Sequence, residues 1–168
     1  MALAIDPSPW LAALTGSDEE ARHAATLALG GFTEADKVVA EPLVAALSSR
    51  DEDVVFWSVV ALGCICLQGC SAAPHLASII RSHTAFGVRQ AAVQSIVKVA
   101  PKAVETRHAV ISALADENAF VRREALQSTL SLLPLAAEEI ASISSLSADP
   151  NQAVSRWSEI VLRRSAKI

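Results

Sequence analysis

The stretch DENAFVRREAL, residues Asp116–Leu126, contains the pattern that decides the fold. Val121 is followed four positions later by the small residue Ala125, and after four more positions by Thr129. Side chains at i, i+4 and i+8 lie on one face of an α-helix, so the pattern predicts a helix and not a strand. We call the first residue of this triplet the anchor. The same triplet recurs at Ala21-Ala25-Leu29, Val54-Ser58-Leu62, Val88-Ala92-Ile96 and Val154-Ser158-Leu162.

The anchors are evenly spaced along the chain, at intervals of 33, 34, 33 and 33 residues. A second helical ladder lies upstream of them and keeps nearly the same period, so each unit has two helices, which we call helix A and helix B. A two-helix unit buries its apolar face by stacking on its neighbours. The predicted fold is all-α, a single domain over 1–168 with five units at about 8–32, 33–69, 70–101, 102–134 and 135–168. The second ladder consists of Trp10, Leu43, Leu76, Val110 and Ile143.

The composition agrees with packed helices and excludes other classes. Of the 168 residues, 52% are hydrophobic and 19% are charged, which excludes a disordered chain. Aromatic residues make up 4%, with no Tyr, which disfavours a β-sandwich. The net charge of −4 is uneven, since residues 1–53 have ten acids and three bases whereas residues 54–168 have eight acids and eleven bases. The acidic first part disfavours a nucleic-acid partner and suits a basic protein or peptide.

Three features bear on location. The N-terminal segment MALAIDPSPW has no basic residue and contains Asp6 and two prolines, so we expect no signal peptide. Residues 54–80 contain no Asp, Glu, Lys or Arg, but the apolar run stops at Leu67, and a run this short predicts a buried helix and not a membrane span. Three cysteines within seven positions do not form a disulfide framework, which favours reduced thiols and a cytoplasmic protein.

The units resemble the HEAT-repeat family, in its short bacterial form, over essentially the whole chain. Repeats of that family have an Asp in the turn between the helices and a Val-Arg pair at the start of helix B, and Asp116 with Val121 and Arg122 matches both. The resemblance implies a right-handed α-solenoid with helix A on the convex side and helix B on the concave side. The family's Asp–Arg ladder is incomplete, so we do not expect it to dominate stability. Other matching positions are Pro9, Pro42 and Pro74 in or near helix A and Arg22 and Val88-Arg89 in helix B, while Val55 and Ser155 replace the Arg.

Few residues could do chemistry. Cys64, Cys66, Cys70 and His75 are of types that bind zinc. However, Cys66 and Cys70 are one helical turn apart while Cys64 points elsewhere on helix B, and Cys is a common small core residue. We therefore predict no metal, no cofactor and no catalytic residue, with a zinc site or a reactive thiol as the alternatives.

The side of helix B that turns away from the core predicts function. With the core at the anchor, +4 and +8, the positions +2, +3 and +6 turn away from it. Unit two has apolar side chains there and unit five has a Trp and an Ile, with amides and an Arg between them, which is typical of a recognition surface. We predict a non-catalytic scaffold that binds a partner protein or peptide on this concave face; alternatively, the two Trp side chains pack against neighbouring helices A. The predicted binding residues are Phe56, Trp57, Val60, Gln90, Gln94, Arg123, Gln127, Arg156, Trp157 and Ile160.

Two further hypotheses stay open. HEAT-like repeats also occur in phycobilin lyases and DNA glycosylases, so the resemblance admits an enzyme or enzyme subunit on the same scaffold. A glycosylase needs a basic groove, and the acidic first part of the chain argues against one.

Separately, exposed solenoid ends tend to stack, and apolar residues near the end of unit five predict end-to-end self-association. These residues are Ile160, Val161, Leu162 and Ile168.

Overall fold

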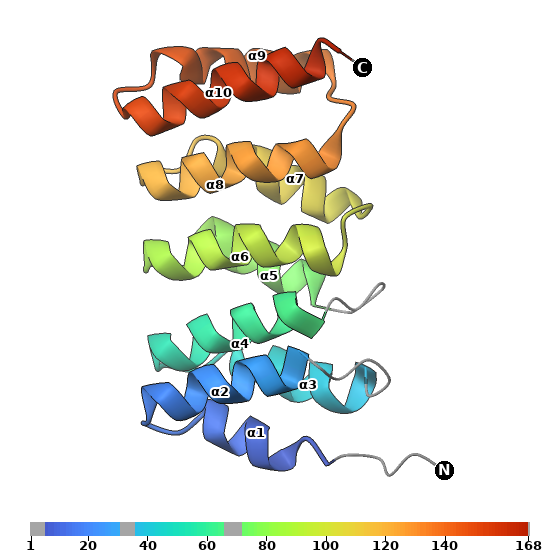
Figure 1. Ribbon diagram of the computed structural model, residues 1–168, viewed down its shortest axis with the longest axis vertical. Coiled ribbons are helices and arrows are strands. Elements are labelled where there is room, and N and C mark those ends of the chain that lie inside the picture. Colours follow the sequence, from blue (N-terminus) through green and yellow to red (C-terminus); the bar gives the residue numbers. More distant parts are fainter. Residues whose placement is uncertain (1–5, 31–35, 66–71, 168) are drawn as a thin grey trace.

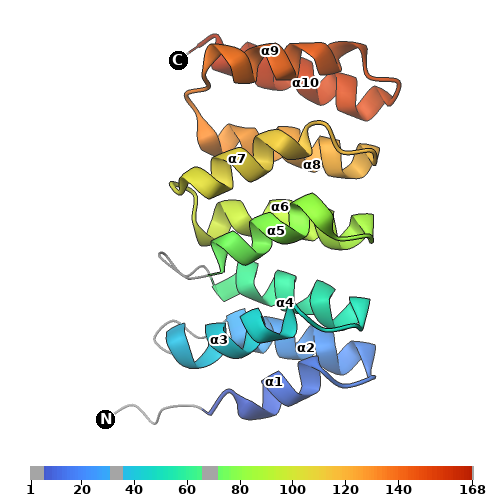
Figure 2. The same cartoon turned by 180° about the vertical axis from the view of Figure 1, so that it is seen from behind.

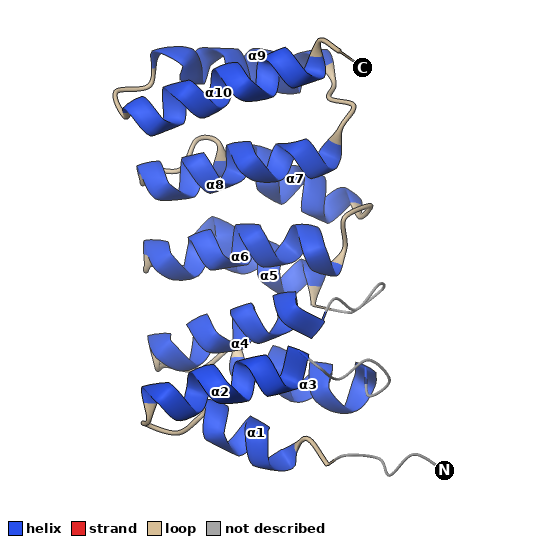
Figure 3. Cartoon of the chain, viewed as in Figure 1, coloured by secondary structure: helices blue, strands red, loops and turns tan. Residues whose placement is uncertain are grey.

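The computed structural model describes residues 6–30, 36–65 and 72–167, and within these ranges all regular structure is helical (Figure 3). The helices form pairs that stack into an α-solenoid, with α1 at one end and α10 at the other (Figure 1). Each predicted unit contains one pair, while the unit boundaries stay a prediction. Helices A are α1 (Ser8–Leu14), α3 (Asp36–Ala46), α5 (Ala73–Ser82), α7 (Val104–Ala113) and α9 (Ala137–Ser145). Helices B are α2 (Glu19–Gly30), α4 (Glu52–Ile65), α6 (Phe86–Val99), α8 (Ala119–Thr129) and α10 (Gln152–Ser165), and the short 3-10 turns Leu130–Leu132 and Leu146–Ala148 follow α8 and α9.

The helices are arranged in two layers. Figure 1 shows the B layer (α2, α4, α6, α8 and α10) and Figure 2 shows the A layer from the opposite side. Each helix of the B layer packs extensively against the next, whereas in the A layer only α5 and α7 do so. A stack that is closer in one layer curves toward that layer, so this packing is the one expected of a B layer on the inner side.

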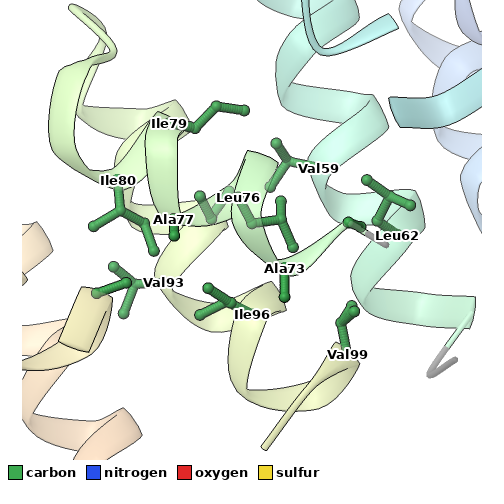
Figure 4. Packing of buried hydrophobic residues seen from close by; sticks show 14 of the residues in the cluster. Val59, Leu62, Ala73, Leu76, Ala77, Ile79, Ile80, Val93, Ile96 and Val99 are labelled. Atoms are coloured by element: carbon green, nitrogen blue, oxygen red, sulfur yellow. The ribbon is translucent and has the colours of Figure 1, made fainter. Parts of the chain in front are cut away.

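Small residues at the predicted seam allow this close packing. The +4 positions Ala25, Ser58, Ala92, Ala125 and Ser158 are all 0–1% exposed, and Val54, Val88 and Val121 are buried at their anchors, as predicted. Larger side chains fill the space between the layers. Figure 4 shows Val59 and Leu62 of α4, Leu76 of α5 and Ile96 of α6 among the buried hydrophobic residues at one such place. Each unit therefore completes its core with the next unit, as sequence periodicity implies.

Side chains in the A–B turns cap the B helices. The residue three positions before the anchor accepts a hydrogen bond from a backbone N–H of the first turn in four units, through Asp18, Asp51, Asn118 and Asn151. Unit three has Ala85 at this position, and there His83 Nδ1 accepts from the Ala85 N–H at 3.2 Å. Ser, Asp and Asn are preferred at such sites because they satisfy N–H groups that begin a helix.

Buried ion pairs join neighbouring units. Arg89 of α6 donates from Nε and Nη2 to the Asp116 carboxylate at 2.8 and 2.9 Å, and Arg122 of α8 donates to Asp149 at 2.8 and 3.0 Å. Each arginine also donates to backbone carbonyls of its own A–B turn, so one side chain holds two units together. The Asp116 carboxylate thus pairs with Arg89 of the preceding unit. Arg122, which is in the same unit as Asp116, donates to the backbone carbonyl of Asp116 and not to its carboxylate.

The ladder of ion pairs is incomplete, as the sequence predicts. Arg22 makes a single ion pair, 3.2 Å to the exposed Asp53, and its buried Nε has no hydrogen-bond partner among the described residues. Between units two and three both partners are replaced, since Val55 stands at the position of the Arg and His83 at the position of Asp116.

Close helix packing takes the place of an ion pair between units two and three. Gly63 of α4 lies so near α6 that an added Cβ would be 2.5 Å from Ser95 Oγ and 3.1 Å from Ser95 Cα. Only a residue without a Cβ fits at that distance, so Gly63 has a steric role in this interface.

The last helix corrects one expectation. Val161 is 0% exposed, so the prediction that it belongs to an exposed apolar end is wrong, and Ile168 lies outside the described residues. Glu159 and Arg163 are exposed on α10 and form an i,i+4 ion pair at 3.2 Å. Ile160 is 37% exposed and Leu162 is half-buried, so end-to-end self-association stays a prediction. Over the described parts of the chain, every helix is too short or too polar to cross a bilayer.

Candidate functional site

The structure places all ten predicted binding residues on the B layer, in α4, α6, α8 and α10. Gln94, Arg156 and Ile160 are exposed. The other seven are half-buried, so part of each side chain packs within the layer and part reaches the surface: Phe56, Trp57, Val60, Gln90, Arg123, Gln127 and Trp157. Binding of a partner by these residues stays a prediction.

The aromatic residues of unit two form a contact between repeats. Phe56 and Trp57 meet edge to face, with ring centroids 5.3 Å apart, and Trp57 also meets His23 of α2 at 5.6 Å. Trp57 and Trp157 both pack against the buried core. The contact of Trp57 with His23 joins two neighbouring helices B, so this Trp contributes to the stacking of units as well as to the surface, while packing of the two Trp side chains against helices A stays a prediction.

Two exposed phenylalanines were missed by the sequence analysis. Phe86 of α6 is 46% exposed and Phe120 of α8 is 52% exposed, and their rings stack with centroids 6.1 Å apart and an interplanar angle of 22°. They occupy positions −2 and −1 relative to their anchors, one helical turn before the face that the sequence analysis considered. Extending that face back by one turn, from +2 to −2 and from +3 to −1, would have found Phe86 and Phe120 respectively.

Arg123 extends the Phe pair along α8. Its guanidinium carbon lies 5.5 Å from the Phe120 ring centroid, within the range of a cation–π contact. Its Nε is buried and has no hydrogen-bond partner among the described residues. The surface around Phe86 and Phe120 therefore combines large apolar rings with a guanidinium group.

The N-terminal ends of the B helices lie along one edge of the stack (Figure 1). In units three and four this edge holds Phe86 and Phe120. In units one and two it holds exposed carboxylates, which we call the acidic edge: Asp18, Glu19, Glu20, Asp51, Glu52 and Asp53. Acids in the first turn suit the helix dipole, and their number also gives this end of the stack a negative field.

Two carboxyl groups with lowered pKa values, Asp149 and Glu139, belong to ion pairs between units. Hydrogen bonding to Arg122 lowers the pKa of Asp149, and hydrogen bonding to Arg107 lowers the pKa of Glu139. Arg107 Nε lies 2.6 Å from Glu139, and Nη1 also donates to the Leu132 carbonyl. These shifts follow from pairs that join the helices, so they point to structure and not to an acid–base pair.

The cysteine cluster is only partly visible. Cys64 is half-buried with a free thiol at the end of α4, while Cys66 and Cys70 lie outside the described residues. Within the described ranges no three His, Cys, Asp or Glu side chains are grouped as metal ligands would be.

Paired helices, stacked in two layers with a shared core, define an α-solenoid repeat protein. A family model for HEAT repeats matches residues 7–97, which is more than half of the chain. The protein therefore belongs to the HEAT-repeat family. No curated protein sequence matches it.

Three of the solved structures with similar folds are designed or engineered proteins of low sequence identity. A designed armadillo repeat protein in complex with the peptide (KR)4 is 17% identical, with a TM-score of 0.68 over 94% of this chain and 81% of that chain. An engineered protein is 18% identical, with a TM-score of 0.64 over 96% and 80%. A computationally designed armadillo repeat protein for modular peptide recognition is 15% identical, with a TM-score of 0.60 over 97% and 89%. At these identities the similarity concerns the fold.

Proposed function

We propose that this protein is a non-catalytic scaffold that binds a partner protein or peptide on the surface of its B layer, and that the partner is basic. The observation behind the proposal is the exposed, stacked pair Phe86 and Phe120. Two large aromatic rings in contact with water are costly for a protein with no partner, and such patches commonly mark interaction sites.

The predicted binding residues fit the same surface. Gln90, Gln94, Arg123 and Gln127 lie on α6 and α8, the helices that present the two Phe rings. Amides and an Arg beside aromatic side chains provide hydrogen bonds to a peptide backbone together with an apolar anchor. The chemistry of this surface therefore supports recognition of a polypeptide.

Charge supports a basic partner. Residues 1–53 have ten acids and three bases, and the acidic edge lies beside the Phe pair along the stack. A negative field attracts a positively charged segment and speeds its encounter. The similar fold of a designed armadillo repeat protein in complex with (KR)4 supports the proposal by analogy. In this proposal the protein acts in the cytoplasm and uses no cofactor.

A peptide selection tests the proposal. A displayed library of random 12-residue peptides is panned against the protein, and selected peptides are labelled for fluorescence anisotropy. We expect the double variant Phe86→Ser/Phe120→Ser to bind selected peptides at least about tenfold more weakly, because the central apolar anchor is lost.

The matched control removes apolar surface from the other layer. Val104 is 63% exposed on α7, a helix A, so Val104→Ser should bind as the wild type does. Equal binding by the wild type and the Phe86→Ser/Phe120→Ser variant, or no selected peptide at all, would reject the B-layer surface.

A further inference from the structure

Glu124 of α8 is a largely buried residue whose carboxylate has no partner among the described residues. It is 9% exposed, and no hydrogen bond or ion pair joins it to any described residue. Neither carboxylate oxygen is sealed from solvent, since neither is among the fully buried unpaired atoms of the described residues. The side chain is therefore largely buried while its carboxylate reaches solvent without a partner among the described residues, and a carboxylate in this setting can pair with a cation from outside the chain.

The neighbouring cation does not neutralise Glu124. Arg123 is next in the chain, but its guanidinium stacks on Phe120, and Arg122 of the same helix pairs with Asp149. Consecutive residues on a helix point about 100° apart, so Arg123 and Glu124 diverge. The carboxylate is thus available to a cation from outside the chain.

The contacts between B helices show which side of α8 Glu124 occupies. Trp57 at +3 of α4 meets His23 at +2 of α2, and Phe120 at −1 of α8 meets Phe86 at −2 of α6. Positions −1 and +3 therefore face the preceding unit. Glu124 is at +3 of α8, one helical turn after Phe120, so it lies on the α6 side of the helix, next to the Phe pair.

Building on the peptide-binding function, we propose that Glu124 and the Phe86–Phe120 pair form a subsite for one Lys or Arg side chain of the bound partner. The cationic head pairs with the Glu124 carboxylate, and the aliphatic stem lies against the aromatic rings. The Phe86 ring also favours a nearby cation through its negative face, whereas the Phe120 ring already has the Arg123 guanidinium beside it. The acidic edge attracts further basic side chains of the same partner toward units one and two.

The distance between the B helices predicts how many residues separate two basic side chains of the partner. Helices pack about 8–10 Å apart, so α8 and α4 are separated by two such steps, and an extended chain advances about 3.3 Å per residue. Two basic side chains of one partner, one at Glu124 and one at the acidic residues of α4, are therefore about six residues apart. An alternating Lys–Arg peptide of eight residues satisfies this spacing.

A charge-matched pair of variants tests the subsite. The probe is a fluorescein-labelled alternating Lys–Arg octapeptide, and anisotropy gives its dissociation constant at fixed salt. Glu124→Gln keeps the shape and removes the charge, and it should weaken binding about tenfold to a hundredfold, as expected for loss of a charge-assisted hydrogen bond. Glu159→Gln removes the same charge from an exposed position on α10 and should leave binding unchanged.

Stability of the free protein gives a second readout. If the Glu124 carboxylate serves a ligand, Glu124→Gln weakens binding without lowering the melting temperature, whereas a purely structural carboxylate would give a lower melting temperature. Glu124→Ala is a second variant for this test, because α6 has an alanine, Ala91, at the same position, where it is 7% exposed.

The possible outcomes separate this subsite from the peptide-binding function. Wild-type protein that does not bind the octapeptide, or equal affinities for Glu124→Gln and Glu159→Gln, overturn the subsite. If the peptide library yields ligands that need Phe86 and Phe120 but have no Lys or Arg, the peptide-binding function stands and the subsite is rejected.

Discussion

Completing the ladder of ion pairs with Ser49→Asp should stabilise the first two units. In the two full pairs the arginine and aspartate are 27 residues apart, as in Arg89–Asp116. The same interval counted from Arg22 leads to Ser49. Ser49 Oγ already accepts a hydrogen bond from the Asp51 N–H at 3.1 Å, as Asp116 Oδ1 does from the residue two positions later, so the turn geometry is retained.

The expected gain follows from what Arg22 lacks. It has one 3.2 Å contact with an exposed carboxylate and a buried Nε without a partner among the described residues. A hydrogen bond to a charged group contributes about 1.5–3 kcal/mol. Desolvation of the new carboxylate and repulsion from Asp51 and Asp53 offset part of this, at about 1 kcal/mol or less per exposed neighbour. We expect a net stabilisation of about 1–2 kcal/mol, which raises the melting temperature by roughly 2–8 °C for a chain of this size.

Urea unfolding provides the assay, with far-UV circular dichroism for the whole stack and tryptophan fluorescence for local events. A double-mutant cycle with Arg22→Met isolates the coupling, because the new aspartate should stabilise only when the arginine is present. Ser48→Asp adds the same charge at an exposed neighbouring position and is the control. Equal stabilities for the Ser49 and Ser48 variants, or a gain that persists without Arg22, would refute the reasoning.

Three other perturbations follow from the same structure. Ala92→Phe or Ala125→Phe overpacks a seam position that is 0% exposed and should cost about 1–3 kcal/mol or more, so an unchanged urea midpoint would contradict the assigned register. Thr106→Val removes a fully buried hydroxyl that has no partner among the described residues, and calorimetry should show a stabilisation of about 1 kcal/mol, whereas a loss would mean that the hydroxyl is paired. The pKa of Asp149 is lowered in the folded state, so its stabilisation is complete above the unfolded value near 3.8 and is lost as pH falls through the folded value. The stability difference between wild type and Asp149→Asn should therefore shrink on acidification below about pH 5, and a difference that is constant with pH would exclude this linkage.

The fold could be predicted because each unit has two sets of core positions, one in helix A and one in helix B, and both sets recur with the period of the repeat. The anchor and +4 positions must be apolar or small wherever one helix B packs on the next, so the period survives in residues such as Val88, Ala92, Val121 and Ala125. The end units repeat the pattern less well. Ala21 and Leu162 are half-buried, because each has a neighbouring unit on one side only.

The ion pairs show what a linear motif leaves out. Asp116 and Arg122 are close in sequence and match a family motif together, yet their carboxylate and guanidinium have partners in different units, Arg89 and Asp149. A motif identifies residue types, whereas the pairing depends on how one unit is placed on the next. The absence of the pair between units two and three could be expected from Val55, but the compensating approach of Gly63 to α6 could not.

The surface could be predicted only in part, because exposure within the B layer depends on which side of the helix meets a neighbour. Position +3 lies against the preceding helix, so Ala91 and Glu124 are buried there although the sequence placed this position on the open face. Packing constrains the residue type less at positions −2, −1, +2 and +6. The residues there differ most between units: α2 and α4 have carboxylates at −2 and −1, whereas α6 and α8 have Phe86 and Phe120. Residues that the core does not constrain can vary to suit a ligand. For that reason the partner's chemistry is better inferred from these positions than from the repeat itself, and Glu124, which stands where α6 has Ala91, is the departure on which the proposed subsite rests.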